Sequence, residues 1–192
     1  DIGVAPVPPR VLDDQDPYSG HVESTQGNTM LSHRNFMVTD AVAISGFPRS
    51  AQELFYFIPT GRFPLDPKQV MDAARKRHSP TVVLVDDEVA AFANIYDVHL
   101  GEYCCTGNVI VDSSKRGQGV GSYLLHCMEQ RAITEYGATE HRLSCFASNT
   151  RALTWYSRMG YQPFAMEERS NYLGRPEMIL HMAKKSCPGP AC

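Results

Sequence analysis

A glycine-rich loop lies between an apolar segment and an amphipathic segment, and it constrains the fold more than any other feature of the chain. The loop, residues 116–121, reads Arg-Gly-Gln-Gly-Val-Gly, so glycine occupies every second position. Residues 108–111 form the largely apolar stretch before it, and residues 120–133 place apolar side chains at helical spacing. This pattern predicts a strand, a glycine loop and a helix. Because glycine lets backbone N–H groups converge on an anion at a helix N-terminus, the loop is a candidate phosphate site.

Two common phosphate-binding motifs fit this loop poorly. A P-loop requires Lys and then Ser or Thr after its last glycine, whereas Ser122 and Tyr123 follow Gly121. A dinucleotide-binding fingerprint requires an acidic residue about 20 positions later, at the end of the next strand. Glu140 has that offset but precedes the next apolar run, and too little chain follows for a doubly wound sheet. A connecting turn without a ligand remains a third interpretation of the loop taken alone.

Residues 111–121 resemble the acetyl-coenzyme A loop of the GNAT superfamily of N-acetyltransferases. The pattern of that loop is Gln or Arg, two residues, Gly, one residue, and then Gly or Ala. Arg116, Gly119 and Gly121 occupy its three fixed positions, while Ser113 stands where many members have proline.

A second segment, residues 149–161, resembles the other signature of the same superfamily. It contains Asn149, Ala152 and Tyr156, followed by glycine and an aromatic residue. Taken alone, these residues also fit a short capped helix, with Asn149 as the N-cap and Tyr156 in the core. The two motifs occur in the expected order, and weaker similarity extends over residues 30–182.

The resemblance implies an α/β fold with a GNAT-like mixed, mostly antiparallel sheet of six or seven strands flanked by helices. Its fourth and fifth strands, 104–111 and 142–146, are then expected to splay apart and admit the pantetheine arm of acetyl-coenzyme A. The implied cofactor-binding residues lie on the fourth strand, the glycine loop and the starts of two helices. They are Val109, Ile110, Val111, Arg116, Gly117, Gln118, Gly119, Val120, Gly121, Ser122 and Asn149.

The implied function is acetyl transfer from acetyl-coenzyme A to a primary amine, of a small molecule or a protein, by direct attack in a ternary complex. Tyr156 is the expected general acid at the thioester sulfur. A backbone N–H of Ile110 or Val111 is expected to stabilise the carbonyl oxygen. The alternative is a non-catalytic acyl-coenzyme A-binding sensor or regulatory module, although a pure binder needs no hydroxyl at the sulfur.

The general base is the least constrained part of this hypothesis. Glu102 is the first candidate and His99 the second, because both lie at the turn between the third and fourth strands. Both also fit ordinary solvated turn residues, and a water chain could replace them. The aromatic residues 55–57 and Phe63 are expected either to line the acceptor pocket or to belong to the core.

Composition and periodicity predict one acetyltransferase domain, residues 29–184, between an extended or disordered N-terminal arm, 1–28, and a flexible tail, 185–192. Helices are expected at 39–45, 49–57, 66–77, 120–133 and 149–159, and strands at 30–35, 81–85, 89–98, 104–111, 142–146, 163–169 and 178–182.

The formal net charge of −3 and the absence of long basic runs predict no nucleic-acid partner. The short basic cluster 75–78 is interpreted as a helix C-terminus that faces its own dipole. No apolar run approaches a membrane span, so no membrane partner is expected. The cysteines lack metal-ligand spacing, so we expect no metal and four buried thiols in a reducing cytoplasm, with Cys187 and Cys192 able to bridge only under oxidation. A homodimer is left open.

Overall fold

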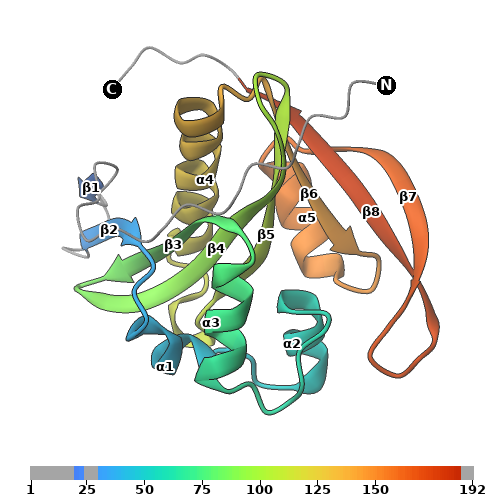
Figure 1. The fold of residues 1–192 in the computed structure, drawn as a ribbon, viewed down its shortest axis with the longest axis horizontal. Coiled ribbons are helices and arrows are strands. Elements are labelled where there is room, and N and C mark those ends of the chain that lie inside the picture. Colours follow the sequence, from blue (N-terminus) through green and yellow to red (C-terminus); the bar gives the residue numbers. More distant parts are fainter. Residues whose placement is uncertain (1–19, 24–29, 187–192) are drawn as a thin grey trace.

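The computed structural model describes residues 20–23 and 30–186, which form one twisted sheet flanked by helices (Figure 1). The eight strands lie in the order β1-β2-β3-β4-β5-β6-β8-β7. Neighbouring strands are antiparallel except β5 and β6, which are parallel. The strands are β1 Gly20–Glu23, β2 Met30–Asn35, β3 His78–Val85, β4 Glu88–His99, β5 Tyr103–Val111, β6 Glu140–Phe146, β7 Gln162–Ser170 and β8 Pro176–Lys185. The predicted mixed, mostly antiparallel sheet is confirmed.

The structure has one strand more than the six or seven that the sequence predicts. β1 lies within residues 1–28, where no periodic apolar pattern marks a strand, and it pairs with β2 from Gly20 opposite His33 to Glu23 opposite Met30. An extended segment can add to the open edge of a sheet through backbone hydrogen bonds alone, which explains why side-chain periodicity did not reveal it. The rest of the expected arm, and Cys187 and Cys192 of the expected tail, lie outside the described residues.

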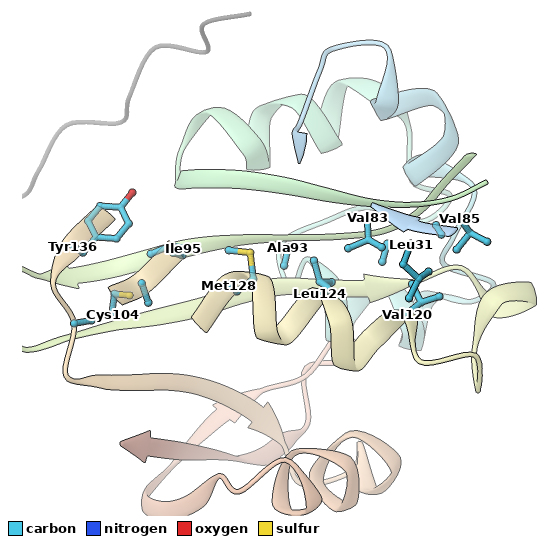
Figure 2. Close-up of a cluster of buried hydrophobic side chains, with 14 residues drawn as sticks. Leu31, Val83, Val85, Ala93, Ile95, Cys104, Val120, Leu124, Met128 and Tyr136 are labelled. Atoms are coloured by element: carbon cyan, nitrogen blue, oxygen red, sulfur yellow. The ribbon is translucent and has the colours of Figure 1, made fainter. Parts of the chain in front are cut away.

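Helices cover both faces of the sheet. The helices are α1 Asp40–Ser45, α2 Ala51–Phe57, α3 Pro67–Arg75, α4 Val120–Tyr136 and α5 Thr150–Arg158, with a 3-10 turn at Ser113–Lys115. Figure 2 shows that α4 packs against one face, where Leu124 and Met128 meet Val83 and Ile95. α1, α2 and α3 pack on the opposite face against Val82 and other strand residues. Because both faces are buried, the central strands are apolar at nearly every position.

Local sequence signals fix most of the helix ends. The Ser50 hydroxyl accepts a hydrogen bond from the Glu53 N–H at 3.1 Å, and Asp66 caps α3 with Pro67 at its first position. All five predicted helices are present, and two have different ends. α4 continues to Tyr136, three residues beyond the expected end. α3 ends at Arg75 rather than Arg77, because the chain already turns toward β3 at Lys76. Arg77 therefore does not face the dipole of this helix.

β5 and β6 pair only over a short distance and then diverge, as the family resemblance implies. Their register runs from Tyr103 opposite Glu140 to Thr106 opposite Leu143 and stops there. Just beyond this branch point, β5 has an extra residue relative to β4, and Asn108 adopts a φ of 48°. The Asn108 side chain fixes the bulge by donating to the Phe57 carbonyl at 2.6 Å.

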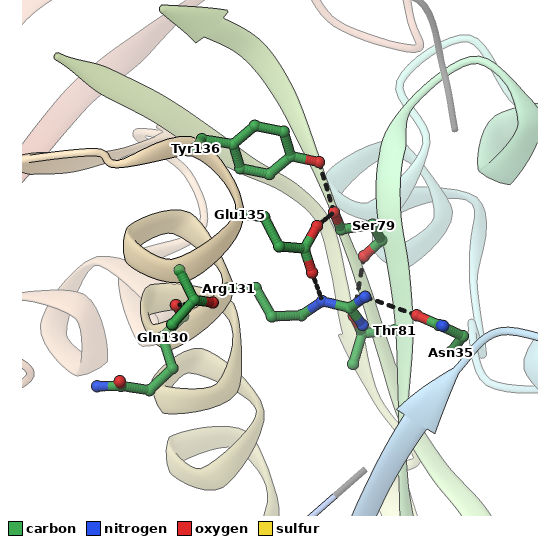
Figure 3. Close-up of polar contacts among 8 residues, drawn as sticks. Asn35, Ser79, Thr81, Gln130, Arg131, Glu135 and Tyr136 are labelled. Carbon is green, nitrogen blue, oxygen red and sulfur yellow. Dashed lines mark hydrogen bonds and ion pairs between the residues drawn. The ribbon is translucent and has the colours of Figure 1, made fainter. Parts of the chain in front are cut away.

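A buried polar network joins α4 to the strands on its side of the sheet (Figure 3). Arg131 pairs with Glu135 at 2.6 Å and donates to Thr81 at 2.8 Å and to Asn35 at 2.6 Å. Glu135 in turn accepts a hydrogen bond from Ser79 at 2.5 Å. Removing one member would leave other buried polar groups without hydrogen-bond partners. The network therefore favours one position of α4 on the sheet.

His141 on β6 is buried outside this network, and it makes the stability of the protein sensitive to acid. Its Nε2 lies 2.7 Å from the Thr106 hydroxyl, and its Nδ1 bonds to the Tyr161 hydroxyl. Burial, aided by the charge of Lys184, lowers the pKa of His141 from 6.5 to about 3. The folded protein thus holds a neutral imidazole that the unfolded chain would protonate.

Acidification is therefore expected to destabilise the protein between pH 6.5 and about 3. Because only the unfolded state binds this proton, His141 should remove about 2 kcal/mol of unfolding free energy between pH 7 and pH 5. Urea titrations at both pH values measure the loss, and His141→Gln should reduce it by that amount. An equal loss in the variant would contradict the assignment.

Candidate functional site

A cavity of about 1180 Å³ lies where β5 and β6 diverge. It extends from the glycine loop to the face of the sheet that carries α2, and its walls come from β5, β6, α2, α5 and the loop. Nine of the eleven expected cofactor residues line it. They are Val109, Ile110, Val111, Arg116, Gly117, Gly119, Gly121, Ser122 and Asn149.

The other two expected cofactor residues do not line the cavity. The Gln118 side chain turns back to donate to the Ser114 carbonyl at 3.1 Å. Val120 is 1% exposed and belongs to the core under α4. The cavity therefore brings together all of the expected cofactor residues except these two.

The glycine loop has the backbone geometry that close approach of an anion requires. Gly117 and Gly119 have φ values of 79° and 82°, and a Cβ atom at either position would meet open space. Glycine adopts such angles without strain, and here it leaves the approach to the first turn of α4 uncovered. Gly121 is needed for another reason, because a Cβ atom there would lie 3.3 Å from the Trp155 ring.

The Arg116 side chain fastens this loop to its surroundings. Its Nε donates to the Val111 carbonyl at 3.1 Å, and its Nη1 pairs with Glu53 of α2 at 3.0 Å. Burial acts to raise the pKa of Glu53, but hydrogen bonds from the Arg49 N–H and from Arg116 outweigh it and lower that pKa. The ionised pair holds the loop against α2, which leaves the backbone N–H groups as the anion donors.

Tyr156 lies on α5, where its side chain is buried in the core and also forms part of the cavity wall. It packs with Leu143 and Cys145, and its hydroxyl makes no hydrogen bond within the part of the chain that the structure describes. Burial raises the pKa of Tyr156, so the hydroxyl stays protonated and able to donate. Burial also raises the pKa of the neighbouring Cys145 thiol to about 12, so a sulfur in these surroundings holds a proton tightly.

Glu102 and His99 do not line the cavity. They lie at the turn between β4 and β5, at the opposite end of β5 from the glycine loop. His99 stacks on Tyr103 with 4.3 Å between ring centroids, and its Nε2 lies 3.3 Å from Asp97. Glu102 is exposed, and its backbone carbonyl accepts hydrogen bonds from the N–H groups of residues 139 and 140. Turn residues that face solvent in this way are poorly placed to act as the base.

The structure places a different chain of polar groups on the cavity wall. The Tyr96 and Ser144 hydroxyls are 3.2 Å apart, and the Ser144 hydroxyl lies 2.9 Å from His181 Nδ1. His181 Nε2 lies 3.4 Å from Glu167 Oε1, close enough for the negative charge to act on the ring although no hydrogen bond joins the two atoms. Proton acceptance from Ser144 requires the tautomer with hydrogen on Nε2. His181 Nδ1 is then the acceptor for the Ser144 proton.

Sequence analysis missed this chain because its members come from β4, β6, β7 and β8, which are far apart in the sequence. Strand alternation at 178–182 would have placed His181 on one face but not against Ser144. We call the part of the cavity lined by Tyr96, Ser144, His181, Arg142 and Arg77 the distal pocket.

The aromatic residues of α2 divide between the two expected roles. Tyr56 and Phe57 line the cavity, whereas Phe55 packs on Phe146 with 4.2 Å between ring centroids. Phe63 is 49% exposed and lines no part of the cavity.

Nothing in the described ranges, 20–23 and 30–186, groups three or more His, Cys, Asp or Glu side chains in a metal-binding arrangement. Cys104, Cys105, Cys127 and Cys145 are buried free thiols. No helix among the same residues is long and apolar enough to cross a membrane.

Comparison with known proteins gives one family match. The model of the acetyltransferase (GNAT) family matches residues 48–161, a range that contains β5, the glycine loop, α4 and α5. No curated protein sequence matches the chain.

Solved structures share the fold at low sequence identity. The ribosomal-protein-S18-alanine N-acetyltransferase from Escherichia coli is 21% identical, with 84% of this chain and 97% of that chain covered and a TM-score of 0.61. YncA from Salmonella typhimurium, solved with its cofactor acetyl-CoA, is 16% identical, with 84% and 96% covered and a TM-score of 0.61. RimJ from Mycobacterium smegmatis, in complex with CoA-disulfide, is 18% identical, with 88% and 87% covered and a TM-score of 0.67.

Proposed function

Because the chain belongs to the GNAT family of acetyltransferases, we propose that it transfers the acetyl group of acetyl-coenzyme A to a primary amine by direct attack in a ternary complex. The observation that carries this proposal is the cavity at the β5–β6 branch point. It connects an anion-binding loop at one end with a proton-accepting chain in the distal pocket, and Tyr156 lies on its wall. The four free thiols fit a reducing compartment, and we place the reaction in the cytoplasm.

The residues present fit acetyl-coenzyme A. The N–H groups of residues 117–121 would hold its pyrophosphate, and the backbone of residues 109–111, which is not paired with β6, would hold its pantetheine arm together with Asn149. When bound, acetyl-coenzyme A supplies an activated acetyl thioester. A backbone N–H of Ile110 or Val111 would donate to the carbonyl oxygen as negative charge grows on it.

Tyr156 is the proposed general acid. Its hydroxyl has no competing partner among the described residues, so it is available to the sulfur of the leaving group. The burial that raises its pKa also makes a nearby thiolate more basic, as the Cys145 thiol illustrates with its pKa of about 12. Because burial raises the pKa of the donor and of the acceptor alike, it does not by itself favour the transfer, and the assignment rests on the position of Tyr156 on the cavity wall.

His181 is the proposed base, in place of Glu102 and His99. The amine would give a proton to the Tyr96 oxygen, Tyr96 would pass its own proton to Ser144, and Ser144 would pass one to His181 Nδ1. The proton ends on the imidazole, where the Glu167 carboxylate stabilises the positive charge. Each hydroxyl is neutral again after the transfer.

Replacing His181 by Gln should lower kcat/KM for the amine by about tenfold to a hundredfold, because the last proton acceptor of the chain is lost. Gln keeps a polar group near Ser144, so the fold should survive. His99→Gln is the matched control and should retain wild-type activity. Raising the pH should partly rescue His181→Gln, because more of the amine is then already deprotonated. Equal activity losses in the two variants would refute this choice of base.

The function itself is tested by measuring coenzyme A release with a panel of amines. Amine-dependent release, with acetylated amine identified by mass spectrometry, is the expected result. Binding of acetyl-coenzyme A without release for any amine would instead support the non-catalytic sensor or regulatory module.

A further inference from the structure

Arg77 is a cation in the distal pocket that lacks a protein counterion. Its guanidinium carbon lies 4.3 Å from the centroid of the Tyr96 ring, and its Nη1 is buried without a hydrogen-bond partner among the described residues. The charged and titratable groups that influence it are Tyr96 and Cys105, and burial raises the pKa of both, so both are neutral at pH 7. A guanidinium removed from water without a carboxylate is unfavourable in the folded state.

The two other arginines of this region differ from Arg77, because each has a carboxylate partner. Arg142 pairs with Glu140 at 2.5 Å and covers the Tyr103 ring. Arg169 pairs with Glu167 at 2.5 Å. Asp97 also lines the cavity, but its carboxylate contacts the Cys105 thiol and His99 Nε2. Of these three arginines, Arg77 alone therefore forms no ion pair among the described residues.

Arg77 sits at the branch point of the sheet rather than at the phosphate loop. A Cβ atom on Gly107, the first residue after the last β5–β6 pair, would lie only 2.7 Å from Arg77 Nη1. Four residues of extended chain separate Gly107 from Val111, which corresponds to about 13 Å. A pyrophosphate held by residues 117–121 is thus too distant to be the counterion of Arg77.

We propose that the acceptor is a small amine that also carries a carboxylate, and that Arg77 binds this carboxylate. The inference rests on the proposed acetyl transfer. The planar guanidinium matches a carboxylate in a two-bond geometry, and a singly charged carboxylate would give Arg77 the ion pair that it lacks among the described residues. A phosphate would bring nearly two negative charges to the same place. With the carboxylate on Arg77, which stacks on Tyr96, the amine of the same molecule lies close to the first hydroxyl of the proton-accepting chain.

The test compares amino acids with their own carboxamides, which lack this charge. Because the amide also has the lower amine pKa, kcat/KM is expressed per deprotonated amine. Coenzyme A release by the wild-type protein should give a kcat/KM about 10²-fold higher for the acid than for the amide. Arg77→Gln should lower the value for the acid by about 10²-fold and leave the value for the amide within about threefold. Arg77→Lys keeps the charge but loses the two-bond geometry, so it should fall between the two.

Arg75→Gln is the matched control, because Arg75 is exposed on α3 two residues away and lines no part of the cavity. It should keep the wild-type preference for the acid. Arg77→Gln should fold at least as well as the wild type, because a cation without a counterion is removed. A wild-type preference for the amide or for an aminoalkyl phosphate, or equal losses for acid and amide in Arg77→Gln, would overturn the proposal.

A binding measurement separates this proposal from the acetyl transfer itself. In the presence of coenzyme A, an amino acid should raise the thermal midpoint of the wild type but not of Arg77→Gln. If no amine releases coenzyme A while this Arg77-dependent shift persists, the transferase function fails and the carboxylate site stands. If no amino acid shifts the wild type, the carboxylate site is refuted whatever the activity.

Discussion

Replacing Tyr156 by Phe lowers kcat by about 10²-fold or more, while acetyl-coenzyme A binds as tightly as before. The variant keeps the ring that packs with Leu143 and Cys145 and removes only the hydroxyl. Because protonation of the sulfur contributes only as the transition state is reached, kcat falls and cofactor affinity does not. Steady-state kinetics together with a cofactor titration measure the two effects separately.

Tyr136→Phe is the control for loss of a buried tyrosine hydroxyl. Tyr136, the last residue of α4, bonds to Ser79 on β3 at 2.6 Å, so its variant should lose about 1 kcal/mol of stability and keep full activity. Tyr156→Phe should instead keep its stability and lose activity, because the Tyr156 hydroxyl has no hydrogen-bond partner among the described residues. If chemistry limits the rate and kcat of Tyr156→Phe stays within about twofold of wild type, Tyr156 is not the acid.

Replacing Gly119 by Asp abolishes the stabilisation that acetyl-coenzyme A gives to the wild-type protein. At a hundredfold excess over Kd, the cofactor should add about 2.7 kcal/mol of apparent stability. A carboxylate about 4 Å from a phosphate costs about 4 kcal/mol at an effective dielectric constant of about 20, which weakens binding by about 10³-fold. The thermal midpoint with and without cofactor reports the loss.

Two variants separate the added charge from the backbone angle. Gly119→Asn places a neutral side chain of the same size at the φ of 82°, so it should retain part of the shift. Gly174 has a φ of 71° and similarly open surroundings in the β7–β8 turn, and Gly174→Asp should retain all of it. A full shift in a folded Gly119→Asp protein would show that the loop does not hold the pyrophosphate.

The parts of the fold that the sequence predicts well are those that local chemistry determines. The glycine loop, the helix after it and the capped helix at Asn149 carry their signals within about 20 residues, and the structure has all three. The turn between β3 and β4, which joins the two predicted strands 81–85 and 89–98, is also determined locally. Asp86 and Asp87 have φ values of 50° and 68° there, and residues of this type tolerate such angles.

The distal pocket could not be predicted in the same way. Its residues come from four separate segments, and contacts between them exist only once the sheet has formed. Chain order places Glu102 and His99 near β5, but the sequence does not indicate the direction in which their turn faces. Arg77 is hard to place for a similar reason, because ending α3 two residues earlier puts its side chain on the cavity wall.

The short pairing between β5 and β6 has a consequence for the order in which the two substrates add. The backbone ladder joins the two halves of the sheet over only four residue pairs, and side chains make the remaining connections. Ile110 belongs to one half, whereas Tyr156 and His181 belong to the other. The Tyr96–Ser144 contact already joins the two sides of the acceptor site, and a pantetheine arm bonded between the halves would add further bonds across the same gap. This architecture favours a sequential reaction in which acetyl-coenzyme A enters before the amine and coenzyme A leaves last.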